Sequence, residues 1–173
     1  MIETERLILA PWTEAERAPY AAMCADPEVM HDYGGPWDEA RTQERFARHV
    51  AAFAADGFCK WSIRRKADRA WIGYCGLNPI FPDLPVSPGL EIGWRMVRDA
   101  WGHGYATEAA RAAIGDIFQR ADAAEIIAFT HPTNARSRAV MRRIGMHRAA
   151  ERDFVYETGF PAVVYTAPRT DWV

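Results

Sequence analysis

The sequence predicts a single domain of the mixed α/β class, in which about four helices pack on a central, twisted mixed sheet of about seven strands. Segments with strand-like alternation and segments with helical periodicity interleave along the chain. Their order is one strand, two helices, three strands, a helix, a strand, a helix and two strands, which is typical of helices packed on a mixed sheet. The length of 173 residues suits one domain with a substantial core, over residues 1–173.

The N-terminal part predicts one strand and two helices. The segment "TERLILAPW" alternates in the manner of a half-buried strand. Thr13 and Glu16 have the spacing of a capping box, so we expect a helix over about 14–24. The segment "ADPEVMHDYGGPW" is broken by proline and glycine and predicts a loop. Asp38 then caps a second helix over about 39–55.

The C-terminal part predicts the rest of the sheet and two more helices. "FCKWSIRR" and "AWIGYCGLNPI" indicate a hairpin, and "LEIGWRMV" a strand over 90–97. A helix follows over 105–120, then a buried strand over 125–130. Asn134 begins the last helix and Gly145 ends it, as N-cap and C-terminal glycine. "RDFVYETG" and "FPAVVYTAP" close the chain as an antiparallel pair.

Composition and termini exclude several classes of protein. A net charge of −2 provides no broad basic surface for nucleic acid. Cys24, Cys59 and Cys75 are odd in number and lack the spacing of a disulfide framework or zinc site. The N-terminus has no signal-peptide pattern, and no apolar run reaches membrane-spanning length. We therefore expect a soluble cytoplasmic monomer or homodimer with no metal and no nucleic-acid or membrane partner.

The segment "RDAWGHGYATEAARAAIGDIF" places Gly102 and Gly104 directly before a helix and allows three interpretations. The glycines can simply form a turn. A dinucleotide-binding loop requires a third glycine, where this chain has Thr107, and no GxxxxGK[ST] motif of a P-loop occurs. The third interpretation is a pyrophosphate seat, in which backbone N–H groups up to Ala106 and the positive end of the helix face one anion. The residues alone leave the turn and the seat open.

Several ordered segments together resemble the GNAT N-acetyltransferases. They are "LEIGWRMVRDAWGHGYATEAARAAI" and "FTHPTNARSRAVMRRIGM", with "ETERLIL", "DPEVMHDYGG" and "FPAVVYTAPR" nearer the ends. They look closest to the branch that modifies protein N-termini, the ribosomal-protein N-alpha-acetyltransferase (RimJ/RimL)-like group. The resemblance covers almost the whole chain and implies the GNAT fold, whose fourth and fifth strands splay apart.

The resemblance implies that acetyl-CoA is the co-substrate and lies between the strands 90–97 and 125–130. Its pantetheine arm would pair with the backbone over 94–97, where one N–H would also stabilise the oxyanion. Its pyrophosphate would rest on 101–107. The cofactor-binding residues that this implies are Trp94, Met96, Val97, Arg98, Trp101, Gly102, His103, Gly104, Tyr105, Ala106, Thr107, Asn134, Ser137 and Arg138.

One position departs from the family pattern. Many members have Gln or Arg three residues before the first loop glycine, where this chain has Asp99. A carboxylate facing pyrophosphate would be repelled. We therefore expect Asp99 to point away and Arg98 to supply any side-chain charge.

The implied reaction is direct attack of a primary amine, on a protein N-terminus or a small molecule, on the thioester. Glu91 is the candidate base, and an outward-facing glutamate in a salt bridge is the alternative. The tyrosine that many members use as an acid is replaced by Met141. Ser137 is the second candidate catalytic residue because its hydroxyl can hydrogen-bond the sulfur, unless it only bonds the helix backbone.

The acceptor is harder to infer. Tyr33, Trp37 and His131 are the candidate substrate-binding residues, and His131 is also the second candidate base. Aminoglycosides or polyamines would favour an acidic cleft, and the first loop is acidic at Asp26, Glu28, Asp32 and Asp38. The missing tyrosine favours a different class, a CoA-binding sensor or partner module without turnover.

Overall fold

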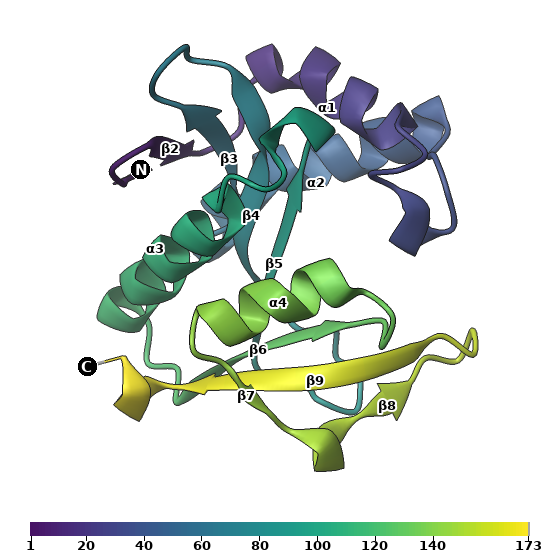
Figure 1. Ribbon diagram of the computed structural model, residues 1–173, viewed down its shortest axis with the longest axis vertical. Helices are drawn as coiled ribbons and strands as arrows, with labels where there is room; N and C mark the ends of the chain where they lie inside the picture. Colours follow the sequence, from purple (N-terminus) through teal and green to yellow (C-terminus); the bar gives the residue numbers. More distant parts are fainter. Residues whose placement is uncertain (173) are drawn as a thin grey trace.

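The computed structural model describes residues 1–172, with the backbone alone for Asp56, and contains one twisted sheet of nine strands in this range. The order across the sheet is β1-β2-β3-β4-β5-β6-β9-β7, and β8 also pairs with β9 (Figure 1). All neighbours are antiparallel except β5 and β6, which are parallel. The strands are β1 Ile2–Glu3, β2 Leu7–Ala10, β3 Lys60–Arg65, β4 Trp71–Pro79, β5 Leu90–Met96, β6 Glu125–Thr130, β7 His147–Arg148, β8 Phe154–Val155 and β9 Pro161–Pro168.

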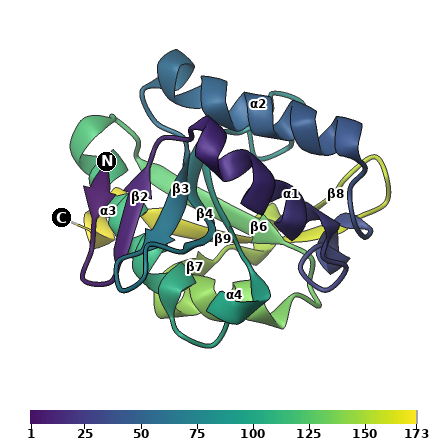
Figure 2. The ribbon, with the colours of Figure 1, turned by 90° about the horizontal axis from the view of Figure 1, so that it is seen from above.

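Four α-helices cover the two faces of the sheet (Figure 2). They are α1 Arg17–Ala25, α2 Glu39–Asp56, α3 Tyr105–Arg120 and α4 Ala135–Arg143. Helices α1 and α2 enclose an aromatic cluster with the near face of β4, whereas α3 and α4 enclose the larger aliphatic core on the opposite face. In the described part of the chain, no helix has the length and apolar character needed to cross a membrane.

The predicted helix starts are confirmed by their capping geometry. Thr13 and Glu16 form a reciprocal capping box before α1. Asp38 Oδ1 accepts the Arg41 backbone N–H at 2.7 Å at the start of α2. Asn134 Oδ1 accepts the Ser137 N–H at 2.9 Å at the start of α4. Local hydrogen bonds therefore fix where these helices begin.

The sheet opens between β5 and β6. The two strands share a single residue pair, Glu91 with Ile127, and diverge from it toward their C-terminal ends. This is the splay expected between strands 90–97 and 125–130. It falls between the fifth and sixth strands because β1, only two residues long, precedes the first predicted strand. β7 is equally short, and two-residue strands leave no alternation to detect in a sequence.

Candidate active site

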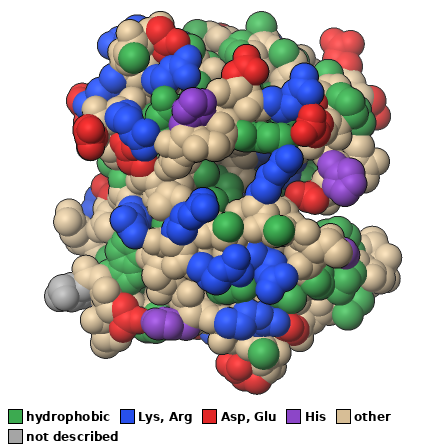
Figure 3. All heavy atoms as spheres, in the orientation of Figure 1, with side chains coloured by type: hydrophobic (Ala, Val, Ile, Leu, Met, Phe, Trp, Pro, Cys, Tyr) green, Lys and Arg blue, Asp and Glu red, His purple; other side chains and the backbone are tan. Residues whose placement is uncertain are grey.

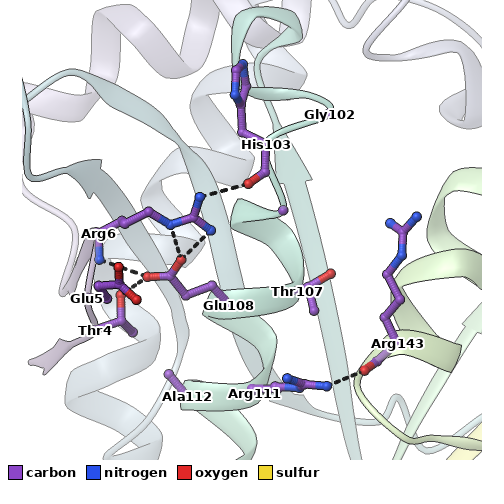
Figure 4. A pocket seen from close by; sticks show the side chains of 11 residues that line it. Thr4, Glu5, Arg6, Gly102, His103, Thr107, Glu108, Arg111, Ala112 and Arg143 are labelled. Atoms are coloured by element: carbon purple, nitrogen blue, oxygen red, sulfur yellow. Dashed lines mark hydrogen bonds and ion pairs between the residues drawn. The ribbon is translucent and has the colours of Figure 1, made fainter.

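A groove of about 910 Å³ lies at the start of α3, beside the splay (Figure 4). It is lined by the loop before α3, the first turns of that helix, the segment before β2 and the end of α4. In Figure 3, Lys and Arg side chains gather over α4 and along the hollow that separates α4 from the N-terminal half. The lining residues are Thr4, Glu5, Arg6, Gly102, His103, Gly104, Thr107, Glu108, Arg111, Ala112 and Arg143.

The backbone at the start of α3 has the form of an anion site. Gly102 and Gly104 both have φ of +79°, in the left-handed region that favours glycine. Gly104 is the N-cap, and no side chain caps the helix. The first N–H groups of an α-helix have no acceptor within the helix, so the positive end of α3 faces the groove uncapped. A backbone in this arrangement can bind a phosphate without any side chain.

Arg6 holds the loop in place. Its Nη1 donates to the His103 carbonyl at 3.0 Å, and its Nε donates to Glu108 Oε2 at 2.7 Å (Figure 4). Thr4 Oγ1 donates to the same carboxylate at 2.5 Å. Burial raises the pKa of Glu108, but the hydrogen bonds from Thr4 and Arg6 outweigh it and leave that pKa lowered. The Glu108 charge is therefore neutralised by Arg6.

Two further guanidinium groups give the groove its positive charge. Arg111 Nη2 donates to the Arg143 carbonyl at 2.5 Å, which joins α3 to the end of α4. Neither side chain forms an ion pair with any other side chain that the structure describes. With Arg6 engaged by Glu108, these two cations are free to meet an anion.

Arg98 lies elsewhere than expected. Its guanidinium pairs with Glu28 Oε2 at 2.9 Å and Asp26 Oδ2 at 3.1 Å, and neither it nor the exposed Asp99 lines the groove. The hydrogen bond to Glu28, with the charge of Asp26, raises the pKa of Arg98. The acidic first loop takes up the Arg98 guanidinium in this structure, and a contribution of Arg98 to the groove stays a prediction.

Most of the other residues expected at the cofactor lie along β5 and the loop before α3. The Met96 side chain is buried, and Trp94 and Val97 pack against the core, so these positions offer mainly backbone. Trp101 Nε1 donates to the Met96 carbonyl at 2.9 Å, and the Arg136 guanidinium lies 4.0 Å from the Trp101 ring. Tyr105 is buried beneath Arg6, whereas Ala106 and Thr107 stay partly exposed on the first turn of α3.

The start of α4 connects to the first loop across the splay. Asn134 Nδ2 donates to Asp32 Oδ2 at 2.5 Å. The Ser137 hydroxyl has no hydrogen-bond partner among residues 1–172, so the alternative of a bond to helix backbone is not observed there. Arg138 donates to the Pro132 carbonyl at 2.8 Å and lies 3.4 Å from the Tyr165 hydroxyl, directed toward β9 and away from the groove.

Glu91 lies on the face of β5 that is turned away from α3, at the closed end of the splay. Its carboxylate is 20% exposed and lies 3.8 Å from Lys60 Nζ, a separation too long for a hydrogen bond. A Cβ at Gly93 would come within 2.9 Å of Lys60 Nζ, so the absence of a side chain there leaves room for both groups. Glu91 is thus next to a cation, as in the salt-bridge interpretation, but it remains accessible.

Tyr33, Lys60, Tyr74, Glu91 and Arg95 form a polar group that we call the Glu91 cluster. Burial lowers the pKa of Lys60, but the charge of Glu91 together with Tyr33, Tyr74 and Cys75 outweighs burial and the pKa is raised, so Lys60 is an ammonium at neutral pH. Burial raises the pKa of Tyr74, which stays neutral. The Arg95 guanidinium lies 4.0 Å from the Tyr33 ring centre and donates to the Val29 carbonyl. Glu91 is the one group in this cluster that can accept a proton at neutral pH.

Of the expected substrate-binding residues, Tyr33 belongs to this cluster, Trp37 contacts Tyr33, and His131 lies beyond β6. Tyr33 and Trp37 make an edge-to-face contact at 5.5 Å. Trp37 Nε1 is buried and has no acceptor among the described residues. His131 packs against Phe160 at 4.9 Å, and its Nδ1 lies 2.7 Å from Thr133 Oγ1.

The cysteines and the possible metal ligands limit the reactions that the site can support. All three are buried free thiols, and burial raises the pKa of each, so thiolate is scarce at neutral pH. No group of three metal-ligating side chains occurs within residues 1–172.

Sequence reasoning missed the side chains that come to the site from distant segments. Arg6, Arg111 and Arg143 line the groove, and Lys60 and Arg95 flank Glu91. Apart from Arg95, none carries a local sequence signal. The alternation of "LEIGWRMV" does place Arg95 on the same face as Glu91, and that signal could have indicated it.

Comparison with known proteins establishes the family. Residues 6–147 match the family model described as an acetyltransferase (GNAT) domain, so the chain belongs to the GNAT acetyltransferases. It is 30% identical to the uncharacterized protein YkkB of Bacillus subtilis (strain 168) over 145 residues, 83% of each chain. It is 29% identical to the FsC-acetyl coenzyme A-N(2)-transacetylase of Aspergillus fumigatus over 185 aligned residues, covering 99% of this chain and 77% of the relative.

Solved structures agree with the fold. An acetyltransferase from Agrobacterium tumefaciens str. C58 superposes with a TM-score of 0.82 at 28% identity, covering 96% of this chain and 92% of that one. The aminoglycoside acetyltransferase AAC(6')-Ib with coenzyme A has a TM-score of 0.75 at 19% identity and 95% coverage of both chains. RimL, a ribosomal L7/L12 alpha-N-protein acetyltransferase in complex with coenzyme A, has a TM-score of 0.74 at 14% identity, and the match covers 95% of both chains. The last two show the fold alone.

Proposed function

We propose that the protein transfers the acetyl group of acetyl-CoA to a primary amine. The observation that carries this proposal is the uncapped start of α3 at Gly104, beside a splay whose closed end holds Glu91. The first feature suits a pyrophosphate and the second suits a proton acceptor, and the open edge of β5 joins them. The co-substrate preference is supported by the GNAT neighbours that contain coenzyme A.

The donor would bind mainly through backbone. Its pyrophosphate would sit on the N–H groups of 102–107, with Arg111 and Arg143 at the rim of the groove. Its pantetheine arm would pair with the free edge of β5 over 94–96, where the splay leaves no neighbouring strand. Backbone donors aimed at this opening also suit the oxyanion that forms when the thioester is attacked.

The chemistry would be direct attack by the neutral amine. Glu91 would accept the amine proton, through a water if the acceptor does not reach it. Lys60 is charged and Tyr74 neutral, so neither competes with it as a base. The buried, protonated cysteines offer no nucleophile for an acyl-enzyme, which supports transfer in one step. The Ser137 hydroxyl, without a partner in the described structure, would hydrogen-bond the departing sulfur.

A second candidate function is a coenzyme A-binding module without turnover. Met141, at the position of the usual acid, is 2% exposed and belongs to the core beneath α4. A methionine there offers no proton to the leaving thiolate. A thiolate is nevertheless a stable enough anion to leave without a strong acid.

Thiol release separates the two functions. The protein is incubated with acetyl-CoA and a panel of short peptides and small primary amines, and free coenzyme A is followed with a thiol reagent. We expect release that depends on the amine and falls sharply in Glu91→Gln. Tight binding of coenzyme A with no release for any acceptor would support the module instead. Acetylation of peptides but not small amines would support the ribosomal-protein branch.

A further inference from the structure

We propose that the amine acceptor carries a carboxylate, which binds Arg95 while Arg41 and Arg45 attract it to the entrance. This rests on the proposed acetyltransferase function and names the class of its substrate. Arg41 and Arg45 belong to α2, and Arg95 belongs to the face of β5 that also carries Glu91. The acceptor would thus present its amine to Glu91 and its anionic group to the guanidinium groups.

Part of the acidic charge of the first loop is already paired within the protein. Asp26 and Glu28 are paired with Arg98, and Glu28 also lies 3.7 Å from Arg136. Asp32 accepts a hydrogen bond from Asn134. Of the four acidic residues that indicated an aminoglycoside or polyamine, Asp26 and Glu28 are therefore neutralised within the protein, whereas Asp32 and Asp38 accept hydrogen bonds from uncharged N–H groups.

The arginines near Glu91, in contrast, have no such counter-charges among the described residues. The Arg41 and Arg45 guanidinium groups lie 4.6 and 5.9 Å from the Trp37 ring, and Arg95 lies over Tyr33. None of the three forms an ion pair with a side chain in the described part of the structure. Tyr33 and Trp37 touch each other, which makes one continuous surface from α2 to β5.

A half-buried guanidinium without a counter-charge is costly, and Arg95 is such a group. Burial lowers its pKa, but the contacts with Tyr74 and Tyr33 outweigh that effect, so it remains fully charged. Its protein acceptors are neutral: the Val29 carbonyl, the Met30 sulfur and the faces and oxygens of aromatic rings. A planar carboxylate is the ligand group that matches such a fork of N–H donors. The surface has an excess of donors that an anionic acceptor would satisfy.

The spacing on β5 limits the size of the acceptor. Glu91 and Arg95 are four residues apart on one face, so their Cα atoms are separated by about 13 Å at about 3.3 Å per residue. Between them Gly93 contributes no side chain, and the space above it holds Lys60 Nζ and a Glu91 carboxylate oxygen. The remaining distance suits a small molecule whose amine and carboxylate lie several bonds apart.

The test compares two amines that differ only in charge, 4-(aminomethyl)benzoate and 4-(aminomethyl)benzamide, with spermidine as a polycation. Initial rates of thiol release give kcat and KM for each. We expect kcat/KM for the benzoate to exceed that for the benzamide by about tenfold or more, mainly through KM, as charge-assisted hydrogen bonds contribute. Added salt should reduce the advantage, because part of it comes from the exposed Arg41.

Three variants test which arginines cause the preference for the benzoate. Arg95→Gln should bring the benzoate-to-benzamide ratio to within about twofold of unity. Arg41→Gln, an exposed change that leaves folding intact, should lower the ratio by a smaller factor. Arg48→Gln is the matched control, because Arg48 is on the same helix, is exposed and pairs with Glu44. It should leave the ratio as in the parent protein.

A binding measurement keeps this inference separate from the proposed function. Calorimetry follows 4-(acetamidomethyl)benzoate and the corresponding benzamide added to the complex with coenzyme A. Preferential binding of the benzoate that Arg95→Gln removes, without turnover of any amine, would support the carboxylate site and refute the enzyme. Turnover with equal or greater preference for the benzamide or spermidine would refute the carboxylate site and leave the enzyme. Failure of both compounds to bind would also refute it.

Discussion

The groove at the start of α3 and the Glu91 cluster are both polar, but they are built differently. The groove is formed by backbone N–H groups at two left-handed glycines, with arginines at the rim. The cluster is formed by side chains from β3, β4, β5 and the first loop. A backbone site depends on local conformation, so it is shared among proteins with the same loop. A side-chain site depends on which residues the fold brings together, so it varies and determines specificity.

The largest effect should come from the side-chain cluster. Glu91→Gln removes the proposed proton acceptor and keeps the shape, and we expect kcat to fall by about 10²- to 10⁴-fold, the range that general base catalysis contributes. Affinity for coenzyme A should stay within twofold, because the groove is on the other side of β5. Steady-state kinetics and calorimetry measure the two quantities.

A matched control for this change is Glu125→Gln. Glu125 is also a strand glutamate in an ion pair, with Arg152 at 2.7 Å, but it is at the start of β6 and its partner belongs to the segment between β7 and β8. It should keep nearly full activity. If Glu91→Gln is as active as Glu125→Gln, Glu91 does not act as the base, and the proposal that the groove binds the donor while the Glu91 cluster accepts the proton is contradicted.

The second effect should be confined to the groove. Gly104→Val places a branched side chain at φ +79° among the N–H donors, so we expect Kd for coenzyme A to rise by at least about tenfold. Gly57→Val is the control, because Gly57 has nearly the same backbone, φ 72° and ψ 0°, in open space at the end of α2. Equal strain with unequal loss of affinity would identify the phosphate seat. Equal affinities in the two variants would contradict it.

The smallest expected effect is on stability, and it concerns His49 in the aromatic layer behind the Glu91 cluster. His49 on α2 stacks on Trp12 at 4.7 Å, and burial, with the charges of Lys60 and Arg45, lowers its pKa to about 3. The unfolded chain binds the proton near pH 6.5, so the contribution of neutral His49 to stability is present above that pH. It is lost progressively as the pH falls from about 6.5 toward 3.

Denaturant unfolding at pH 7 and pH 5 tests this sign. The free energy of unfolding should decrease between these values in the parent protein, and by less in His49→Gln. His31→Gln, which changes an exposed histidine, should behave as the parent does. An unaltered pH dependence in His49→Gln would show that another group causes the loss.

The sequence predicted the parts of the fold that local patterns encode. Caps at Thr13, Asp38 and Asn134 fixed the helix starts, and the alternation of "LEIGWRMV" placed β5. The two-residue strands β1 and β7 were not predicted, because an alternating pattern cannot be recognised in two positions. The ion pairs of Arg98 could not be predicted, because they join it to Glu28, 70 residues away, and to Asp26 in the same loop. The surroundings of Glu91 could not be predicted for the same reason, since Lys60 reaches it from another strand.

The central claim is that the donor lies on the start of α3 with its thioester between β5 and β6, beside Glu91. The most direct test is a crystal structure of the protein with acetyl-CoA. We predict pyrophosphate oxygens within hydrogen-bond distance of backbone N–H groups of 102–107, and the thioester at the opening of the splay. A nucleotide bound away from this loop, or a thioester remote from Glu91, would contradict it.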